Sequence, residues 1–240
     1  MKSMIITLDG PAGAGKSSVS RQLAQRLGVD FLDTGAMYRG ITAYALSQGI
    51  DPTAEPQRVA RLSEDLRIFF KWEHSPPRLT IAHHEKIIDL TARLRDQDVA
   101  KHVSPVAAIS QVRQVLVQAQ RRIGNEHPRL VTEGRDQGSL VFPDASVKFY
   151  IDASPAVRVS RRAVQLKNAG RANIDLKQIQ DDIAARDFRD MNRKDGPLVC
   201  PQDAIVIDTS DLEQSQVIDL LEKHVRENID PASLAGVTAK

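Results

Sequence analysis

The sequence predicts an α/β fold with a doubly wound, five-stranded parallel sheet, and three observations lead to that prediction. Five short apolar runs rich in β-branched residues are spread along the chain. Helical patterns of apolar residues separate most of these runs. A glycine-rich loop connects the first run directly to the first helical pattern. Strands that alternate with helices pair in parallel, because each helix carries the chain back across the sheet.

The alternation begins at the N-terminus, where Met4 to Leu8 form the first apolar run. The segment "KSSVSRQLAQRLG" places four apolar residues on one face of a helix, namely Val19, Leu23, Ala24 and Leu27. Gly28 follows as the residue expected to end that helix. The run "VDFL" predicts a second strand, and Asp33 or Thr34 can cap the helix after it.

The clearest helical pattern of the chain lies in "SPVAAISQVRQVLVQAQRRIG". Ser104 is expected at its N-cap, Pro105 in its first turn and Gly124 at its end. Its apolar stripe consists of Val106, Ile109, Val112, Leu116 and Ile123. Three further apolar runs, "RLVTE", "VKFYID" and "AIVID", complete the five strands of the predicted sheet.

Two segments do not fit the alternation of strands and helices. Leu66 to Leu90 contains three short strand patterns, which indicates a small antiparallel insert, and Val157 to Asn192 is helical, rich in arginine and broken at "NAGRAN". We expect one domain over residues 1–240, with weak periodicity from Glu227 on. Its parts would be a core (1–65, 100–156 and 193–225), an acceptor-side insert (about 66–99), a helical lid (about 157–192) and a loose tail (about 227–240).

The composition is that of an ordinary globular protein. The 240 residues carry a formal net charge of +2, which is too small to indicate binding to nucleic acid. The single Cys200 rules out an internal disulfide and favours an inert buried thiol. Because the N-terminus opens into a strand and no stretch is long enough to span a bilayer, we expect a cytoplasmic protein without a membrane partner.

The glycine loop carries the strongest motif of the sequence. Gly10, Gly15, Lys16 and Ser17 satisfy G-x-x-x-x-G-K-[ST] between a strand and a helix, which is the pattern of P-loop nucleotide-binding proteins. Backbone N–H groups of such a loop converge on phosphate, while the lysine reaches the β- and γ-oxygens and the Ser17 hydroxyl reaches Mg²⁺. The residues expected to bind ATP here are Gly10, Pro11, Ala12, Gly13, Ala14, Gly15, Lys16, Ser17 and Ser18.

A second group of cations distinguishes a phosphotransferase from a hydrolytic switch. Four segments supply candidates: "LDTGAMYR", "SPVAAISQVR", "EGRDQGSLVFPDA" and "RDFRDMNR". Together with the glycine loop they resemble the bacterial cytidylate kinases, over roughly Met4 to Leu221. The resemblance implies transfer of the γ-phosphoryl group of MgATP to CMP or dCMP, with a small three-stranded insert and a lid.

The resemblance also implies roles for individual residues. Lys16, Arg39, Arg135 and Arg193 would carry catalysis, with the three arginines gripping the acceptor phosphate through their planar forks. Arg158, Arg161 and Arg162 resemble lid arginines that close over the triphosphate, although an exposed basic helix face is the alternative. The acceptor nucleotide would contact Asp33, Thr34, Tyr38, Arg39, Ser104, Arg113, Gly134, Arg135, Asp136, Arg186, Asp190 and Arg193.

Cytosine recognition needs a carboxylate for the exocyclic amine and donors for the ring acceptors. Asp136, Arg113 and Ser104 match the family positions for those roles, but Ser104 could instead serve only as a helix cap. Tyr38 could equally be a core residue, and Asp33 could order waters around Mg²⁺ or cap its helix. Glu133 ends its strand where the family usually has aspartate.

We therefore expect a (d)CMP kinase that uses ATP and Mg²⁺, in pyrimidine nucleotide metabolism, as a monomer. The alternatives are a P-loop kinase for another small acceptor, such as UMP or shikimate, and a nucleotide-dependent switch or nucleic-acid-binding ATPase. Against the last class, the arginines are spread over separate segments and only 4% of residues are aromatic. The six histidines show no metal-ligand spacing and are expected on the surface.

Overall fold

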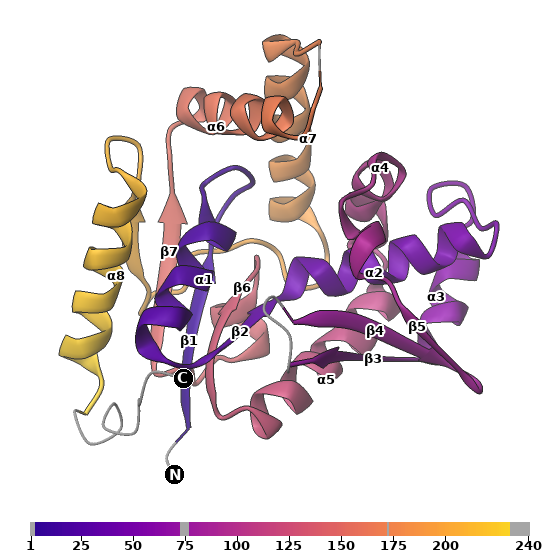
Figure 1. Cartoon of the computed structure of the whole chain (residues 1–240), viewed down its shortest axis with the longest axis horizontal. Coiled ribbons are helices and arrows are strands. Elements are labelled where there is room, and N and C mark those ends of the chain that lie inside the picture. Colours follow the sequence, from indigo (N-terminus) through magenta and orange to yellow (C-terminus); the bar gives the residue numbers. More distant parts are fainter. Residues whose placement is uncertain (1–2, 73–76, 172, 231–240) are drawn as a thin grey trace. The chain divides into compact units, whose positions relative to one another are not determined.

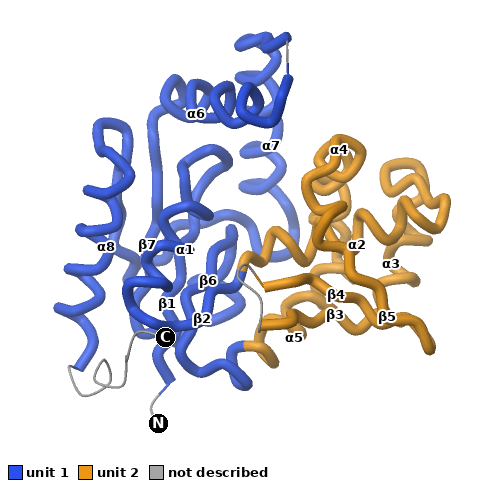
Figure 2. The backbone as a smooth tube through the Cα atoms, in the orientation of Figure 1, with its two compact units in different colours: residues 1–32, 124–240 blue, residues 33–123 orange. Residues whose placement is uncertain are grey.

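A computed structural model of the chain describes residues 3–72, 77–171 and 173–230 (Figure 1). The chain divides into two compact units, one formed by residues 1–32 and 124–240 and the other by residues 33–123 (Figure 2). These boundaries differ from the expected ones, since the second unit also takes in the helices on either side of the small insert. Each unit is described by itself.

The first unit contains the five-stranded sheet, in the order β2-β6-β1-β7-β8. Its strands are β1 (Met4–Asp9), β2 (Asp30–Asp33), β6 (Arg129–Glu133), β7 (Val147–Asp152) and β8 (Ile205–Asp208). β1 pairs in parallel with β6 and β7, and β7 pairs in parallel with β8. The predicted parallel sheet is thereby confirmed, and it places the carboxyl ends of β1, β6 and β7 at one edge.

Helices α1 (Lys16–Leu27) and α8 (Gln214–Asn228) pack side by side on this sheet. Leu23 of α1, Leu221 of α8 and Phe149 of β7 are almost completely buried in one hydrophobic cluster. Gly28 ends α1 in the left-handed conformation, with φ 57°, so the expected C-terminal stop is confirmed. This core fixes the strand end and the helix start that flank the glycine loop.

Two further helices of the first unit form the segment expected to be a lid. α6 (Pro155–Asn168) begins after Ser154 and α7 (Leu176–Asn192) after Asp175, and both cap residues accept hydrogen bonds from the first helical turn. The two helices contact each other (Figure 1). Between β6 and β7 the chain makes one short π-helical turn, η2 (Gln137–Val141).

The second unit holds the small antiparallel sheet, which the sequence predicted. β3 (Leu66–Lys71), β4 (Arg78–His83) and β5 (Lys86–Asp89) pair in that order, with Ile68 opposite Ile81 and Ile81 opposite Ile88. The other elements of this unit are α2 (Thr34–Ser47), α3 (Pro56–Glu64), the 3₁₀ turn η1 (Thr91–Arg95), α4 (Gln97–Val106) and most of α5 (Ser110–Glu126). Helix α2 contacts β4 and α4, so the sheet is one part of a larger unit.

Three local expectations were wrong. The helix predicted from Ser104 to Gly124 is two helices: Ser104 and Pro105 lie in the last turn of α4, and α5 continues past Gly124. The tail starts later than expected, because α8 extends through Asn228, and residues 231–240 lie outside the described part. Cys200 is exposed, not buried.

Gly124 stays helical for a packing reason. A Cβ atom at Gly124 would lie 2.5 Å from the Phe142 ring and 3.4 Å from Ile5 Cδ1, so glycine permits this close approach. Gly124, Phe142 and Ile5 all belong to the first unit, and the lack of a side chain at Gly124 lets the other two residues pack against the helix backbone. Its position near the helix end had suggested a cap.

Gly124→Ala should lower the free energy of unfolding by about 1–3 kcal/mol, because overpacking outweighs the better helix propensity of alanine. Urea unfolding of the variant measures this change. Asn125→Ala, at the next and exposed position of α5, is the matched control and should leave stability unchanged or slightly higher. A Gly124→Ala variant as stable as the wild type would contradict the packing argument.

Candidate functional site

The glycine loop leaves β1 at Asp9 and enters α1 at Lys16, in the first unit. Gly10, Gly13 and Gly15 have φ values of 145°, 80° and 92°, a region that side chains disfavour. A Cβ at Gly10 would lie 2.0 Å from the Ile151 carbonyl oxygen. Glycine is therefore required here both by the backbone and by the neighbouring strand β7.

Lys16 is buried and lies across its own loop. Its Nζ donates hydrogen bonds to the carbonyl oxygens of Gly10 and Pro11, at 2.8 and 2.7 Å. Burial, together with the nearby charge of Arg135, lowers the pKa of Lys16 to about 7, although Glu133 acts in the opposite direction. The lysine holds the loop in a curled form and stands next to the arginine of the adjacent strand end.

Ser17 and Glu133 meet where the loop and β6 come together. Leu8 of β1 is in register with Glu133 of β6, and Ser17 Oγ donates a short hydrogen bond to Glu133 Oε1. Glu133 is buried. The resemblance described above implies an aspartate at this position, where this chain has a glutamate. The hydroxyl and the carboxylate are both oxygen ligands, the type that Mg²⁺ prefers.

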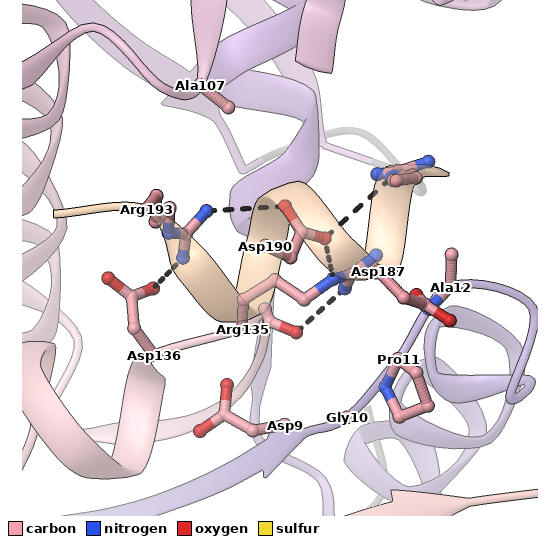
Figure 3. Close-up of polar contacts among 12 residues, drawn as sticks. Asp9, Gly10, Pro11, Ala12, Ala107, Arg135, Asp136, Asp187, Asp190 and Arg193 are labelled. Carbon is pink, nitrogen blue, oxygen red and sulfur yellow. Dashed lines mark hydrogen bonds and ion pairs between the residues drawn. The ribbon is translucent and has the colours of Figure 1, made fainter. Parts of the chain in front are cut away.

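Beyond Glu133, the turn after β6 carries Arg135 and Asp136 toward the end of α7 (Figure 3). Arg135 Nε donates to Asp190 Oδ2 at 2.9 Å, and Arg193 Nη1 lies 3.5 Å from Asp190 Oδ1. Arg193 Nη2 also lies 3.9 Å from Asp136 Oδ1. The structure thus brings together two predicted phosphate-binding arginines and two predicted acceptor carboxylates within the first unit.

Asp190 is the centre of this cluster. Burial alone would raise its pKa, but Arg135 and the neighbouring arginines hold the pKa of Asp190 below its ordinary value. Arg186 contributes from one helical turn earlier, with Nε 3.9 Å from Asp190 Oδ2. The sequence placed Arg186, Asp190 and Arg193 on one helical face; α7 ends at Asn192, so Arg193 follows its last turn.

The lid arginines divide into two groups. Arg158 donates to the Ala12 carbonyl oxygen at 3.1 Å, and Arg161 to the Ala14 carbonyl oxygen at 3.3 Å, so both reach the glycine loop. Arg161 also donates to Thr209 Oγ1 and to the Thr209 carbonyl oxygen. Arg162 instead donates to Gln165 on its own helix, and burial together with Arg171 lowers its pKa. The structure therefore associates Arg158 and Arg161 with the loop, but not Arg162.

Two buried carboxylates near the loop were missed by the sequence reasoning. Asp187 accepts a hydrogen bond from the Ala12 N–H at 3.0 Å and pairs with Arg158. Asp9, at the end of β1, accepts hydrogen bonds from the N–H groups of Gln137 and Gly138, at 2.9 and 2.7 Å. The i, i+3 spacing of Asp187 and Asp190 was visible in "RDFRDMNR", but nothing in the sequence linked either missed residue to the glycine loop.

Asp9 joins the donor loop to the turn that carries Arg135 and Asp136. Burial raises the pKa of Asp9, and the hydrogen bonds from the Gly138 and Gln137 N–H groups oppose this. The net effect is a pKa of about 6. The same carboxyl group thus sits at the start of the glycine loop and anchors η2. It positions both segments without lying in either motif.

Gly134 lies in the first unit, where its carbonyl oxygen accepts from Arg135 Nη1 at 2.9 Å, whereas the second unit holds the remaining residues predicted to contact the acceptor. Asp33 caps α2 by accepting from the Ala36 N–H at 2.9 Å, and its other oxygen accepts from Arg39 Nη2 at 2.7 Å. Tyr38 is buried, and its hydroxyl accepts from Arg113 Nη1 at 3.2 Å. Ser104 lies inside α4, so its expected role as a cap is wrong. Thr34 is buried at the start of α2.

Arg113 is only 2% exposed, which is unusual for arginine, and its guanidinium lies 5.8 Å from the centre of the Tyr38 ring. Its Nη1 also lies 3.5 Å from the Ala107 carbonyl oxygen. That Arg39 joins Arg135 and Arg193 on one phosphate stays a prediction.

Two features are absent from the described residues. Across residues 3–72, 77–171 and 173–230, no three His, Cys, Asp or Glu side chains are grouped so as to hold a metal ion. Within the same ranges, no helix has the length and apolar character needed to cross a membrane.

His83 was expected on the surface with the other histidines. It is half-buried and shares a 2.8 Å hydrogen bond with Tyr44, so that expectation was wrong for this residue.

The raised pKa of Asp9 makes a prediction about stability. Between its ordinary pKa of 3.8 and about 6, the folded protein holds more protons on Asp9 than the unfolded chain does. The stability of the wild type relative to Asp9→Asn should therefore be greatest near pH 4 and decrease as the pH rises through 6. Urea unfolding at pH 4, 5, 6 and 7 measures it.

Asp144→Asn, at an exposed position, is the control for removing one carboxylate. If the wild type and Asp9→Asn gave parallel stability profiles over this range, the pKa of Asp9 would not differ between the folded and unfolded states.

Comparison with known proteins identifies the family of the chain. The family model described as "Cytidylate kinase" matches residues 6–227. The chain is 38% identical over 226 residues to the cytidylate kinase of Streptomyces avermitilis, covering 94% of each chain. It is 41% identical over 223 residues to that of Rhodococcus opacus, covering 91% of this chain and 93% of the other.

Among solved structures, an uncharacterised protein from Eubacterium ventriosum aligns over 93% of this chain and 98% of its own, with a TM-score of 0.51 and 12% identity. This likeness concerns the fold alone. The family match over most of the length, together with the glycine loop and the arginine and carboxylate cluster beside it, leads to one conclusion: this chain belongs to the cytidylate kinase family of phosphotransferases.

Proposed function

We propose that this protein transfers the γ-phosphoryl group of ATP to CMP or dCMP, giving ADP and CDP or dCDP. The observation that carries the proposal is the cluster of Arg135, Asp190 and Arg193 in the same unit as the Lys16 loop. A donor cradle alone would suit a hydrolytic switch, whereas a second set of phosphate-binding cations suits a phosphotransferase. The cytidylate kinases of Streptomyces and Rhodococcus support the choice of acceptor.

On the donor side, the loop from Gly10 to Ser18 would hold the triphosphate through its N–H groups and the start of α1. Lys16 would exchange its contacts with the loop carbonyls for contacts with the β- and γ-oxygens. Placing its ammonium against phosphate would favour the charged form and reverse the lowering of its pKa. Arg158 and Arg161, already at the loop, would add charge from the lid.

The contact between Ser17 and Glu133 fits a magnesium ion. We propose that the Ser17 hydroxyl binds Mg²⁺ and that Glu133 orders its waters, consistent with the preference of Mg²⁺ for oxygen ligands and retained water. Mg²⁺ would supply charge neutralisation on the β- and γ-phosphates when bound.

On the acceptor side, Arg39, Arg135 and Arg193 would hold the acceptor phosphate, and Arg186 and Asp190 the ribose. Asp136 would accept from the cytosine amine, and Arg113 would donate to the ring acceptors. Uracil presents an acceptor where cytosine presents that amine, so Asp136 would face it unfavourably. Thr34, Tyr38 and Gly134 would complete the contact surface, and Ser104 would contact the base from its position in α4.

The chemistry requires no general base. A phosphate monoester with a second pKa near 6 is mostly a dianion at neutral pH, so its oxygen can attack directly. That oxygen forms a bond to the γ-phosphorus while the bond to the β,γ-bridging oxygen breaks and ADP leaves. Catalysis would come from alignment and from neutralising the charge of two polyanions.

We further propose that the enzyme acts in the cytoplasm as a monomer. The residues assigned to the donor loop and to the acceptor phosphate all come from one chain, which supports the monomer. Gel filtration with light scattering tests the oligomeric state.

A panel of acceptors tests the proposal directly. With ATP as donor and a coupled assay for ADP, CMP and dCMP should be phosphorylated at least about ten times more efficiently than UMP, because of the pairing expected at Asp136. Shikimate and a no-acceptor sample are included as controls. Transfer to UMP or shikimate without transfer to CMP would contradict the proposal, and so would hydrolysis stimulated only by RNA or DNA.

Arg135→Ala and Arg193→Ala should each lower turnover with CMP by about 100-fold or more, because each removes a positive charge that would align and neutralise the acceptor phosphate during transfer. Thermal unfolding should show that both variants remain folded. Arg189→Ala, at an exposed position of the same helix α7, is the control and should retain turnover. Wild-type turnover in either of the first two variants would remove that arginine from the mechanism.

A further inference from the structure

Asp187 is a buried acidic residue of α7 to which the proposed chemistry gives no role. It is 7% exposed, and its two carboxylate oxygens have different partners. Oδ1 accepts the Ala12 N–H of the glycine loop at 3.0 Å, and Oδ2 pairs with the Arg158 guanidinium of α6. One carboxylate therefore connects three segments: the loop, α6 and α7.

Arg158 is fixed by this arrangement. Its Nε donates to the Ala153 carbonyl oxygen at 3.1 Å, and its Nη1 donates both to the Ala12 carbonyl oxygen at 3.1 Å and to Asp187. A Cβ at Gly13 would lie 3.2 Å from Arg158 Cβ, so the backbones of α6 and the loop are close together. The start of α6 is thus held against the loop by side-chain and backbone contacts together.

A carboxylate suits this position better than a neutral side chain. Arg158 is mostly withdrawn from water, with 12% of its side chain exposed, and a buried guanidinium needs a counter-ion. Asp190, three residues further along α7, serves the arginines of the acceptor side in the same way. Asp187 and Asp190 therefore divide the arginines between the donor loop and the acceptor side.

We propose that Asp187 is a positioning residue that holds Arg158 and the start of α6 against the glycine loop before the nucleotide binds. The proposal rests on the proposed function in one respect, that Arg158 serves the phosphates of the donor. Its consequence is that the donor nucleotide meets a loop whose lid arginine is already in place. The protein then loses less conformational freedom when the nucleotide binds.

Asp187→Asn tests the proposal with little change of shape. The asparagine oxygen can still accept the Ala12 N–H, but the counter-ion of Arg158 is lost. Asp182→Asn is the matched control, because Asp182 lies on the same helix, is exposed and accepts a surface hydrogen bond from Gln178. Asp187→Glu restores the charge.

The first measurement is hydrogen exchange of α6, residues 155–168, in the protein without nucleotide. Asp187→Asn should speed exchange near Arg158 by about 5-fold or more, and Asp182→Asn should not. The second is the dissociation constant of ADP, which should rise about 5- to 20-fold in Asp187→Asn and recover at least partly in Asp187→Glu. In the transfer assay, KM for ATP should rise while KM for CMP stays within about 2-fold.

A double variant separates positioning from general destabilisation. If Asp187 acts through Arg158, adding Arg158→Gln to Asp187→Asn should weaken ADP binding little beyond the stronger of the two single variants. Unchanged exchange and unchanged ADP affinity in Asp187→Asn would overturn the proposal, and so would tighter ADP binding, which would mean that the carboxylate competes with the phosphates. Additive effects in the double variant would overturn it as well.

Exchange and ADP binding need no acceptor, so they keep this proposal apart from the proposed function. A wild-type protein that does not phosphorylate CMP would refute the proposed function. The effect of Asp187 on Arg158 and α6 could still be measured.

Discussion

Positive charge gathered beside a phosphate-binding loop needs counter-ions within the protein, and the first unit depends on this balance. Lys16, Arg135 and Arg193 are all buried or nearly so, and without acidic partners they would repel one another. Asp190 and Glu133 raise the pKa of Arg135 against the effect of its burial. The acidic residues compensate the charge of the arginines and orient them.

Helix α7 has a central place in this balance. Its face from Asp187 to Asp190 meets the arginine of α6, the loop amide of Ala12 and the arginine of the β6 turn. The helix itself is amphipathic and capped by Asp175, so its existence is a local matter. Its partners, in contrast, lie 29 to 175 residues away along the chain. A shift of α7 would therefore disturb donor-side and acceptor-side arginines together.

The sheet provides the other constraint, because β1 connects the two sides directly. Asp9 ends β1, accepts from the η2 amides, and is followed at once by the glycine loop. Register between β1 and β6 then places Glu133 beside Leu8, within reach of Ser17. A parallel sheet brings strand ends to the same edge, and that edge is where Asp9, Ser17 and Glu133 lie.

The strands, the small antiparallel sheet and the break between α6 and α7 could be predicted because each rests on a local pattern of apolar and turn residues. The boundary of α5 could not. Ser104 and Pro105 have the residue types of a helix start, yet they occupy the last turn of α4, since burial of Val99 and Val106 extends that helix over them. Gly124 has the residue type of a helix end, yet it lies against Phe142, a contact that no local pattern contains.

By itself the sequence determined the order of strands and helices, the glycine loop and the residue types of the site, because these depend on short-range periodicity and on motifs with fixed spacing. Only the tertiary structure decided which carboxylate pairs with which arginine, that Asp9 and Asp187 belong to the site, and that Arg162 stands apart from Arg158 and Arg161. Those pairings depend on burial and on the meeting of distant segments. A linear pattern of residues records neither.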